Sequence, residues 1–218
     1  YEKIRLSVTS ETTYDQRKGF FSYSSAHQQM AENFKGENDL QPVAETSVVL
    51  PGTLADDGVD PTNLGSAFHE LAQIMVETQS KVDEKTIDKL CLKNSVPQRA
   101  ISRVKQALEL WSNSAIRQEA LAHDVVIAES PFTLQVDSEY GNYVEGAIDL
   151  LAYNKGSKDA LVVDYKTGDK GLSATQIYEH HQMQANFYAY VLMQRGFTKV
   201  KCAFVCVEVE EAGQPHVA

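Results

Sequence analysis

The chain has 218 residues, 43% of them hydrophobic, which suffices for one substantial core and most simply for a single domain. Its 20 Lys and Arg residues are outnumbered by 30 Asp and Glu residues, so the chain, with a formal net charge of −10, lacks the basic excess usual in a free-standing DNA-binding domain. No apolar stretch has the length of a signal peptide or a transmembrane helix. Because the first residue is Tyr rather than Met, we expect a cytoplasmic piece of a larger protein.

The N-terminal region has the least regular pattern. Within residues 1–60, the amino acids Asp, Glu, Gln, Asn and Gly dominate and Pro51-Gly52 marks a break, which predicts a partly irregular N-terminal arm. The core is expected over residues 61–207. Residues 208–218 are expected to form a C-terminal tail with a strand end and a turn.

Three helices are predicted at the start of the core. Apolar residues recur at helical spacing after the start signal Asp60-Pro61-Thr62-Asn63, which predicts an amphipathic helix from 63 to about 78. His69 falls at the edge of its apolar stripe, where a histidine is more often an ordinary boundary residue than a ligand. A second helix is expected over 83–93 and a third from about Pro97.

A strand and a β-hairpin are predicted after these helices. The strand-like stretch covers 125–136 and contains Glu129, which would ordinarily be a solvated strand-edge residue. The runs 143–153 and 160–165 are rich in Val, Ile, Leu and Tyr, and residues 154–158 between them have turn chemistry. These runs therefore predict an antiparallel pair.

Two aspartates are expected to face each other across this hairpin. A turn centred on Gly156-Ser157 places Asp149 opposite Asp164, and Lys166 shares their face because side chains alternate along a strand. Opposed Cβ atoms lie roughly 5 Å apart, where two unit charges repel by roughly 3 kcal/mol at an effective dielectric of about 20. A raised carboxyl pKa, the Lys166 ammonium or a bound cation must offset this repulsion.

A divalent cation suits this arrangement, because Mg²⁺ and Mn²⁺ prefer carboxylate, carbonyl and water ligands. The backbone carbonyl of Tyr165, between two site residues, is a further candidate ligand. These residues alone also allow a solvated hairpin in which Lys166 merely neutralises two exposed acids.

A last helix and strand complete the predicted core. The pattern over 174–194 is helical, and Gln184 and Tyr188, four residues apart, are neighbours on its surface. By themselves they are equally compatible with a polar residue at the core margin and a buried tyrosine. The apolar run 200–207 is expected to complete a sheet, and the odd number of cysteines indicates reduced core residues: Cys91, Cys202 and Cys206.

Several of these segments together resemble a known family. Gly146-Ala147-Ile148-Asp149 followed by Val163-Asp164-Tyr165-Lys166-Thr167-Gly168 resembles the PD-(D/E)xK nuclease signature. More narrowly, the chain resembles the RecB-type nuclease domain of bacterial helicase-nucleases such as RecB and AddA. Residues 64–71, 128–132 and 184–189 match further motifs of that family in the same order. The resemblance covers about 61–207, and five motifs in order are far more specific than any one of them.

The resemblance implies the fold and the roles of the remaining residues. It implies an α/β, restriction-endonuclease-like core in which a central mixed β-sheet is flanked by helices, with the His69 helix on one side and the Gln184 helix on the other. It also implies that His69 is a metal ligand and that Glu129 is a direct or water-mediated ligand. The Gln184 and Tyr188 pair would lie near the metal and orient its ligands or the nucleic acid.

The implied function is a metal-dependent deoxyribonuclease, expected to be the exonuclease part of a recombinational DNA repair machine. One or two Mg²⁺ or Mn²⁺ ions, held by Asp149, Asp164 and His69, would activate water, and Lys166 would orient or deprotonate that water or stabilise the phosphate oxygens. The expected partners are linear DNA and a helicase domain or subunit elsewhere, because these residues contain no GxxxxGK[ST] phosphate loop. Three cysteines cannot supply the four that hold an iron–sulfur cluster in some relatives, so no cluster is expected.

Two other functions stay open. One is an endonuclease acting on flaps or on RNA, because nothing in the sequence reads the sugar. The other is a catalytically silent DNA-end-binding or scaffolding domain. The presence of Asp149, Asp164 and Lys166 argues against the silent domain.

Overall fold

The computed structural model describes residues 20–22, 59–138, 141–168 and 170–218. Most of the predicted N-terminal arm therefore lies outside the described residues. The described helices are α2 (Pro61–Thr78), α3 (Glu84–Lys93), α4 (Ile101–Asn113), α5 (Ala115–Leu121) and α6 (Ala174–Gln194). The described strands are β1 (Phe20–Ser22), β2 (Val125–Ser138), β3 (Gly141–Tyr153), β4 (Asp159–Lys166), β5 (Lys199–Glu211) and β6 (Gln214–Val217).

The strands form one mixed sheet. Strand β3 pairs antiparallel with β2 and β4, β5 runs parallel to β4, and β6 pairs antiparallel with β5. Strand β1 pairs parallel with the first half of β3. The hairpin register runs from Tyr153 opposite Ala160 to Leu150 opposite Val163, which confirms the predicted register over these pairs.

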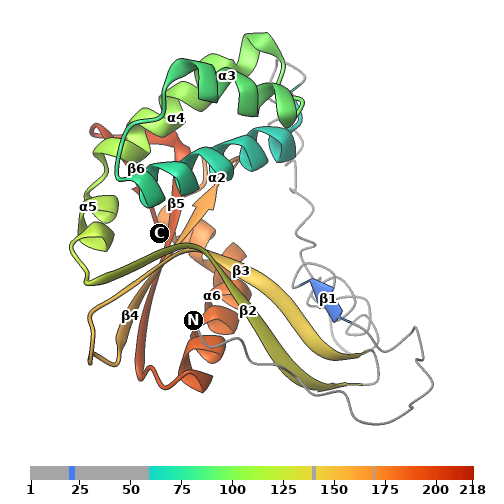
Figure 1. The fold of residues 1–218 in the computed structure, drawn as a ribbon, viewed down its shortest axis with the longest axis vertical. Helices are drawn as coiled ribbons and strands as arrows, with labels where there is room; N and C mark the ends of the chain where they lie inside the picture. The colour runs from blue at the N-terminus through green and yellow to red at the C-terminus, as the bar shows by residue number, and fades with distance from the viewer. Residues whose placement is uncertain (1–19, 23–58, 139–140, 169) are drawn as a thin grey trace.

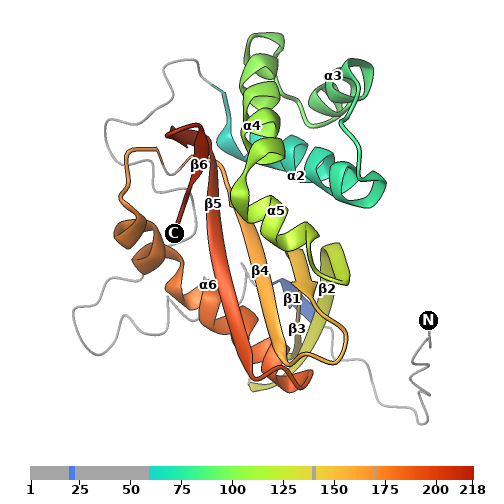
Figure 2. The same cartoon turned by 90° about the vertical axis from the view of Figure 1, so that its left-hand side faces the viewer.

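Helices cover both faces of the sheet (Figures 1 and 2). Helices α2 to α5 pack on one face around a core that includes Phe68, Trp111 and Val163, and α6 packs on the other face against Ile148 and Val162. Each large side chain that is fully buried in this way stabilises the fold by about 1.5–3 kcal/mol. The α/β class and the placement of the two predicted site helices on opposite faces are thus confirmed.

The helix starts follow from their capping residues. Asp60 accepts a 2.9 Å hydrogen bond from the Thr62 amide and Pro61 occupies the first helical position, so α2 begins earlier than the predicted residue 63. Helix α4 begins at Ile101 rather than near Pro97, because residues 98–100 form a 3₁₀ turn. Helix α5, capped by Ser114, was not predicted.

The end of the chain belongs to the sheet. Strand β5 continues to Glu211, a turn follows, and β6 returns along β5, so that the backbones of Phe204 and Ala218 exchange hydrogen bonds of 2.9 and 3.0 Å. Residues 208–218 thus differ from the expected tail, because a second strand satisfies the edge of β5. In the part of the chain that the structure describes, no helix is long and apolar enough to cross a membrane.

Candidate metal-dependent active site

A cleft of about 860 Å³ opens between α2, the sheet and the middle of α6. The eight predicted site residues all line it: His69, Glu129, Asp149, Asp164, Tyr165, Lys166, Gln184 and Tyr188. They come from five elements that are distant in the sequence. The fold therefore brings together every residue to which the sequence assigned a role.

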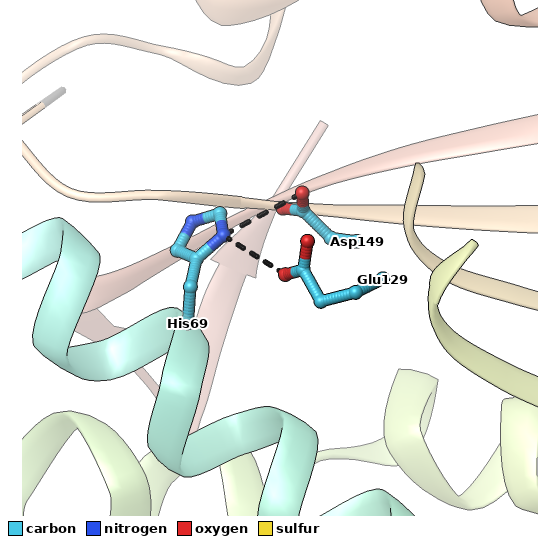
Figure 3. A group of neighbouring side chains, drawn as sticks. All are labelled: His69, Glu129 and Asp149. Atoms are coloured by element: carbon cyan, nitrogen blue, oxygen red, sulfur yellow. Dashed lines mark ion pairs between the residues drawn. The ribbon is translucent and has the colours of Figure 1, made fainter. Parts of the chain in front are cut away.

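Three of these side chains form a candidate metal site (Figure 3). The Nδ1 atom of His69 lies 3.6 Å from Glu129 Oε1 and 3.5 Å from Asp149 Oδ1. One ligand atom from each residue lies within 4.8 Å of the others. Two carboxylate oxygens and one imidazole nitrogen are a donor set that fits a divalent cation such as Mn²⁺ or Mg²⁺.

The carboxylates of Glu129 and Asp149 converge because the alternation of side chains between the two faces of the sheet is interrupted at neighbouring positions of β2 and β3. The ladder pairs Ala128 with Leu150 and Ser130 with Ile148 but skips the two acids between them. Leu150 packs in the core under α2, whereas Ile148 packs in the core under α6. At this crossing point Glu129 adopts a left-handed conformation, with φ 47°, which is uncommon for any residue except glycine.

The prediction that Asp149 and Asp164 are paired on one face of the hairpin is wrong, because the β3–β4 ladder ends at Leu150 opposite Val163 and Asp149 lies at the crossing point. Its Oδ1 faces His69 from α2, while its Oδ2 accepts a 2.7 Å hydrogen bond from the backbone amide of Tyr165. Asp164 points instead toward α6 and lies outside the group of three. The two aspartates thus lie near one another without sharing one side-chain environment, and the metal-binding role of Asp164 stays a prediction.

Asp164 is held by a second network, which consists of hydrogen bonds and one ion pair. Its Oδ1 accepts hydrogen bonds from the Tyr188 hydroxyl at 2.9 Å and from Gln184 Nε2 at 3.1 Å, and its Oδ2 is ion-paired with Lys166 Nζ at 2.9 Å. The Lys166 ammonium also donates to Gln184 Oε1 at 2.8 Å. Because Asp149 and Asp164 are only 8% and 3% exposed, the alternative of a solvated hairpin is wrong.

The chain matches the PD-(D/E)XK nuclease superfamily model over residues 44–217. It belongs to that superfamily. The comparison with curated protein sequences finds no match. Among solved structures, the crystal structure of SSO0001 is similar, with 14% identity over 88% of this chain and 73% of that chain. Its TM-score of 0.34 carries no information on function.

Membership of the superfamily indicates what the metal-site group and the Asp164 network can do chemically. These proteins are nucleases that use divalent metals, and the group formed by His69, Glu129 and Asp149 supplies the donor atoms for one. Lys166, at the end of β4, lines the same cleft, and its assignment to the lysine position of the family signature stays a prediction. The site therefore has the parts of a metal-dependent nuclease.

The short distances between the charged side chains of the site perturb the pKa values of His69 and Asp149. Burial lowers the pKa of His69, but Asp149 and the other nearby carboxylates outweigh this effect and raise it to about 9. Burial, together with repulsion by Asp164, raises the pKa of Asp149 to about 7. A bound cation would need both groups deprotonated, so metal binding must displace protons.

The metal-free protein is therefore expected to lose stability as the pH rises. The folded state binds an extra proton on Asp149 between pH 3.8 and about 7, and on His69 between pH 6.5 and about 9. The free energy of unfolding then falls by up to about 1.4 kcal/mol per pH unit for each proton. Melting temperatures measured in EDTA between pH 6 and 9 test this expectation, and in His69→Gln the fall above pH 7 should be smaller. Stabilisation by Mn²⁺ should grow over the same range.

Tyr188 is expected to position Asp164 and not to bind metal. In Tyr188→Phe the ring stays but Asp164 loses one hydrogen-bond donor, a loss of about 1–3 kcal/mol for a hydrogen bond to a charged group. We expect a roughly tenfold or larger decrease in kcat with Mn²⁺ affinity nearly unchanged. Single-turnover cleavage and calorimetric titration of Mn²⁺ measure the two quantities separately. Tyr178→Phe, on the exposed side of α6, is the matched control.

Tyr165 supports the site with its ring. The ring lies on the α2 face, edge-on to His69 at 5.5 Å between centroids, and it also contacts Phe68 and Trp111. It therefore packs behind the imidazole and restricts its orientation. The role of the Tyr165 carbonyl as a ligand stays a prediction.

Two residues near the site were missed by the sequence reasoning. Gly65 lies against Thr167, where an added Cβ would be 2.9 Å from Thr167 Oγ1, so a glycine lets α2 approach the end of β4. The ring of Phe204, on β5, lies 5.6 Å from Lys166 Nζ and packs beneath that ammonium. Gly65 lies in the matched motif 64–71 but was given no role, and Phe204 has no local sequence signal, because each contact joins elements that are distant in the chain.

Proposed function

We propose that this chain is a RecB-type, divalent-metal-dependent deoxyribonuclease that hydrolyses phosphodiester bonds in linear DNA. One observation carries the proposal. The group formed by His69, Glu129 and Asp149 lies in the same cleft as the ion pair between Asp164 and Lys166. Metal donors beside a positioned ammonium are the parts that hydrolysis of a phosphodiester requires.

The residues of the chain divide the work. When bound, a divalent cation supplies positive charge that favours hydroxide over water and neutralises charge developing on the phosphate. His69, Glu129 and Asp149 would hold Mg²⁺ or Mn²⁺, with Asp164 and the Tyr165 carbonyl as further candidate ligands. Tyr188 and Gln184 fix the Asp164 carboxylate, which in turn fixes the Lys166 ammonium.

Lys166 acts on the attacking water or on the phosphate oxygens. The Lys166 side chain is only 17% exposed, and its ammonium is held by Asp164 and Gln184. An ammonium fixed in this way needs little reorganisation when negative charge develops on the phosphate, so it stabilises the transition state effectively. The same group is placed to orient the attacking water by hydrogen bonding.

An exonuclease role in recombinational DNA repair, with DNA delivered by a helicase domain or subunit, is the finer part of the proposal. Its support is electrostatic. Among the described residues that line the cleft, His69 and Lys166 face five carboxylates, those of Glu70, Glu129, Glu145, Asp149 and Asp164. An acidic cleft attracts DNA weakly, so a partner that feeds the strand would offset this weakness.

The test is a cleavage assay on labelled DNA. Linear single- and double-stranded DNA should be cut in Mg²⁺ or Mn²⁺ and left intact in EDTA, and closed circles should resist an exonuclease. Cutting of closed circles or flaps would assign an endonuclease, and cutting of RNA alone would change the substrate. Binding of DNA ends without cleavage in either metal would show a catalytically silent domain and refute the proposal.

A further inference from the structure

Basic side chains gather at the end of the sheet opposite the cleft. Two connections meet there: the β3–β4 turn, and the link between α6 and β5, which lie at the lower end of the molecule in Figures 1 and 2. The Lys158 carbonyl accepts hydrogen bonds from the Thr198 and Lys199 amides, which holds the two connections side by side. We call the exposed cations on these connections and at the start of β5 the basic end: Lys155, Lys158, Arg195, Lys199 and Lys201.

Three of these cations are available to a ligand. Lys201 is ion-paired with Glu119, and Arg195 donates to the Pro131 carbonyl. Among the described residues, the ammonium groups of Lys155, Lys158 and Lys199 have no carboxylate within ion-pair distance. Three lysines without an ion-pair partner among the described residues place positive charge at this end of a chain whose net charge is −10, and this charge attracts an anion.

The cleft and the basic end lie a defined distance apart. Strand β4 connects them, because Lys166 lies in the cleft and Asp159, at the other end of β4, pairs with Lys199. The seven residue steps of an eight-residue strand span about 23 Å at roughly 3.3 Å per step. That length corresponds to about seven base pairs of duplex at roughly 3.4 Å per pair.

From this geometry we propose that the basic end binds the phosphate backbone of the DNA about seven base pairs from the phosphate that is cut. The proposal rests on the proposed function, which places the reacting phosphate in the cleft. In this arrangement the acidic cleft, at one end of the sheet, hydrolyses the phosphodiester, and the basic end, at the other, binds the DNA. Lysine ammonium groups on mobile stems suit contacts to phosphates that carry no sequence information.

Binding measurements on the whole chain test the proposal. The variant Lys155→Gln/Lys158→Gln/Lys199→Gln removes three cations, and the control Lys81→Gln/Lys85→Gln/Lys89→Gln removes three exposed cations near and on α3. The two variants therefore have the same net charge. Affinity for hairpin DNA with a 20-base-pair or a 4-base-pair stem is measured by fluorescence anisotropy at several salt concentrations, in Ca²⁺.

We expect the basic-end variant to bind the longer stem at least tenfold more weakly, with a log–log salt slope reduced in magnitude by about 2–3, as loss of three phosphate contacts requires. Its affinity for the shorter stem, and both affinities of the control, should stay within about twofold of wild type. Circular dichroism and the single variants Lys158→Gln and Lys199→Gln establish that weaker binding does not come from unfolding.

Two results would overturn the basic-end proposal: equal losses in the two triple variants, which would show a general charge effect, or an unchanged affinity for the longer stem. Failure of the nuclease proposal gives a different result. In that case wild type cuts neither stem in Mg²⁺ or Mn²⁺, whereas the dependence of binding on the basic end is measured independently of cutting.

Discussion

Lys166→Ala is expected to lower the rate of DNA cleavage by about 10²–10⁴-fold, the range that a positioned acid–base group contributes. The lysine is the ammonium held between Asp164 and Gln184, and in the described cleft His69 is the other cationic side chain. Its loss removes the positive charge beside the reacting phosphate but leaves the three metal donors intact. Manganese should therefore still bind.

Single-turnover cleavage and calorimetric titration of Mn²⁺ separate these two effects. The titration belongs at about pH 8.5, because Lys166 also lowers the pKa of Asp149 and its removal makes that carboxyl harder to ionise. Lys81→Ala changes an exposed lysine that does not line the cleft, and this control should cleave like wild type. Wild-type cleavage by Lys166→Ala would remove this residue from the mechanism.

Asp149→Asn is expected to weaken manganese binding strongly and to abolish cleavage. Asp149 links the metal site to the backbone of β4, since one oxygen faces His69 and the other accepts the Tyr165 amide hydrogen bond. An asparagine carbonyl can still accept that hydrogen bond, so the strand pairing should persist. The change removes one of the two negative donors of the metal site. We expect it to weaken Mn²⁺ binding by about 100-fold or more, because loss of even an outer-shell partner of a metal site costs about 10–100-fold in affinity.

The matched control is Glu145→Gln. Glu145 is exposed and lines the same cleft, but it lies outside the group formed by His69, Glu129 and Asp149. This variant has the same change of charge, so a loss confined to Asp149→Asn would come from metal coordination and not from the field of the cleft. If both variants bound and cleaved equally well, the metal site would have to lie elsewhere.

The local features of the fold could be predicted from the sequence because interactions between residues close in the chain decide them. Helix α6 has the predicted bounds. Its apolar spacing and its Ser173 capping box both depend only on residues that are close together in the sequence. The hairpin register followed from the turn length between two β-rich runs. The α/β class and the opposed site helices came from the family resemblance, and the packing of the two cores confirms them.

Other features needed contacts between distant residues. The Asp164 network joins β4 to α6 through Gln184 and Tyr188, whose spacing alone was equally compatible with a core margin. The predicted tail became β6 because the edge of β5 offers it hydrogen bonds, which no pattern within 208–218 specifies. The short helix α5 was missed because seven residues give too little periodicity for recognition.

By itself, the sequence placed the candidate site residues on identifiable helices and strands: two aspartates, a glutamate, a histidine and a lysine. Only the tertiary structure decided how they divide into groups. The exchange of faces at Glu129 and Asp149 turns these acids toward His69, while Asp164 turns toward Lys166 and α6. Alternation along a strand is a local rule, and the twist and packing of neighbouring strands decide where that rule is broken.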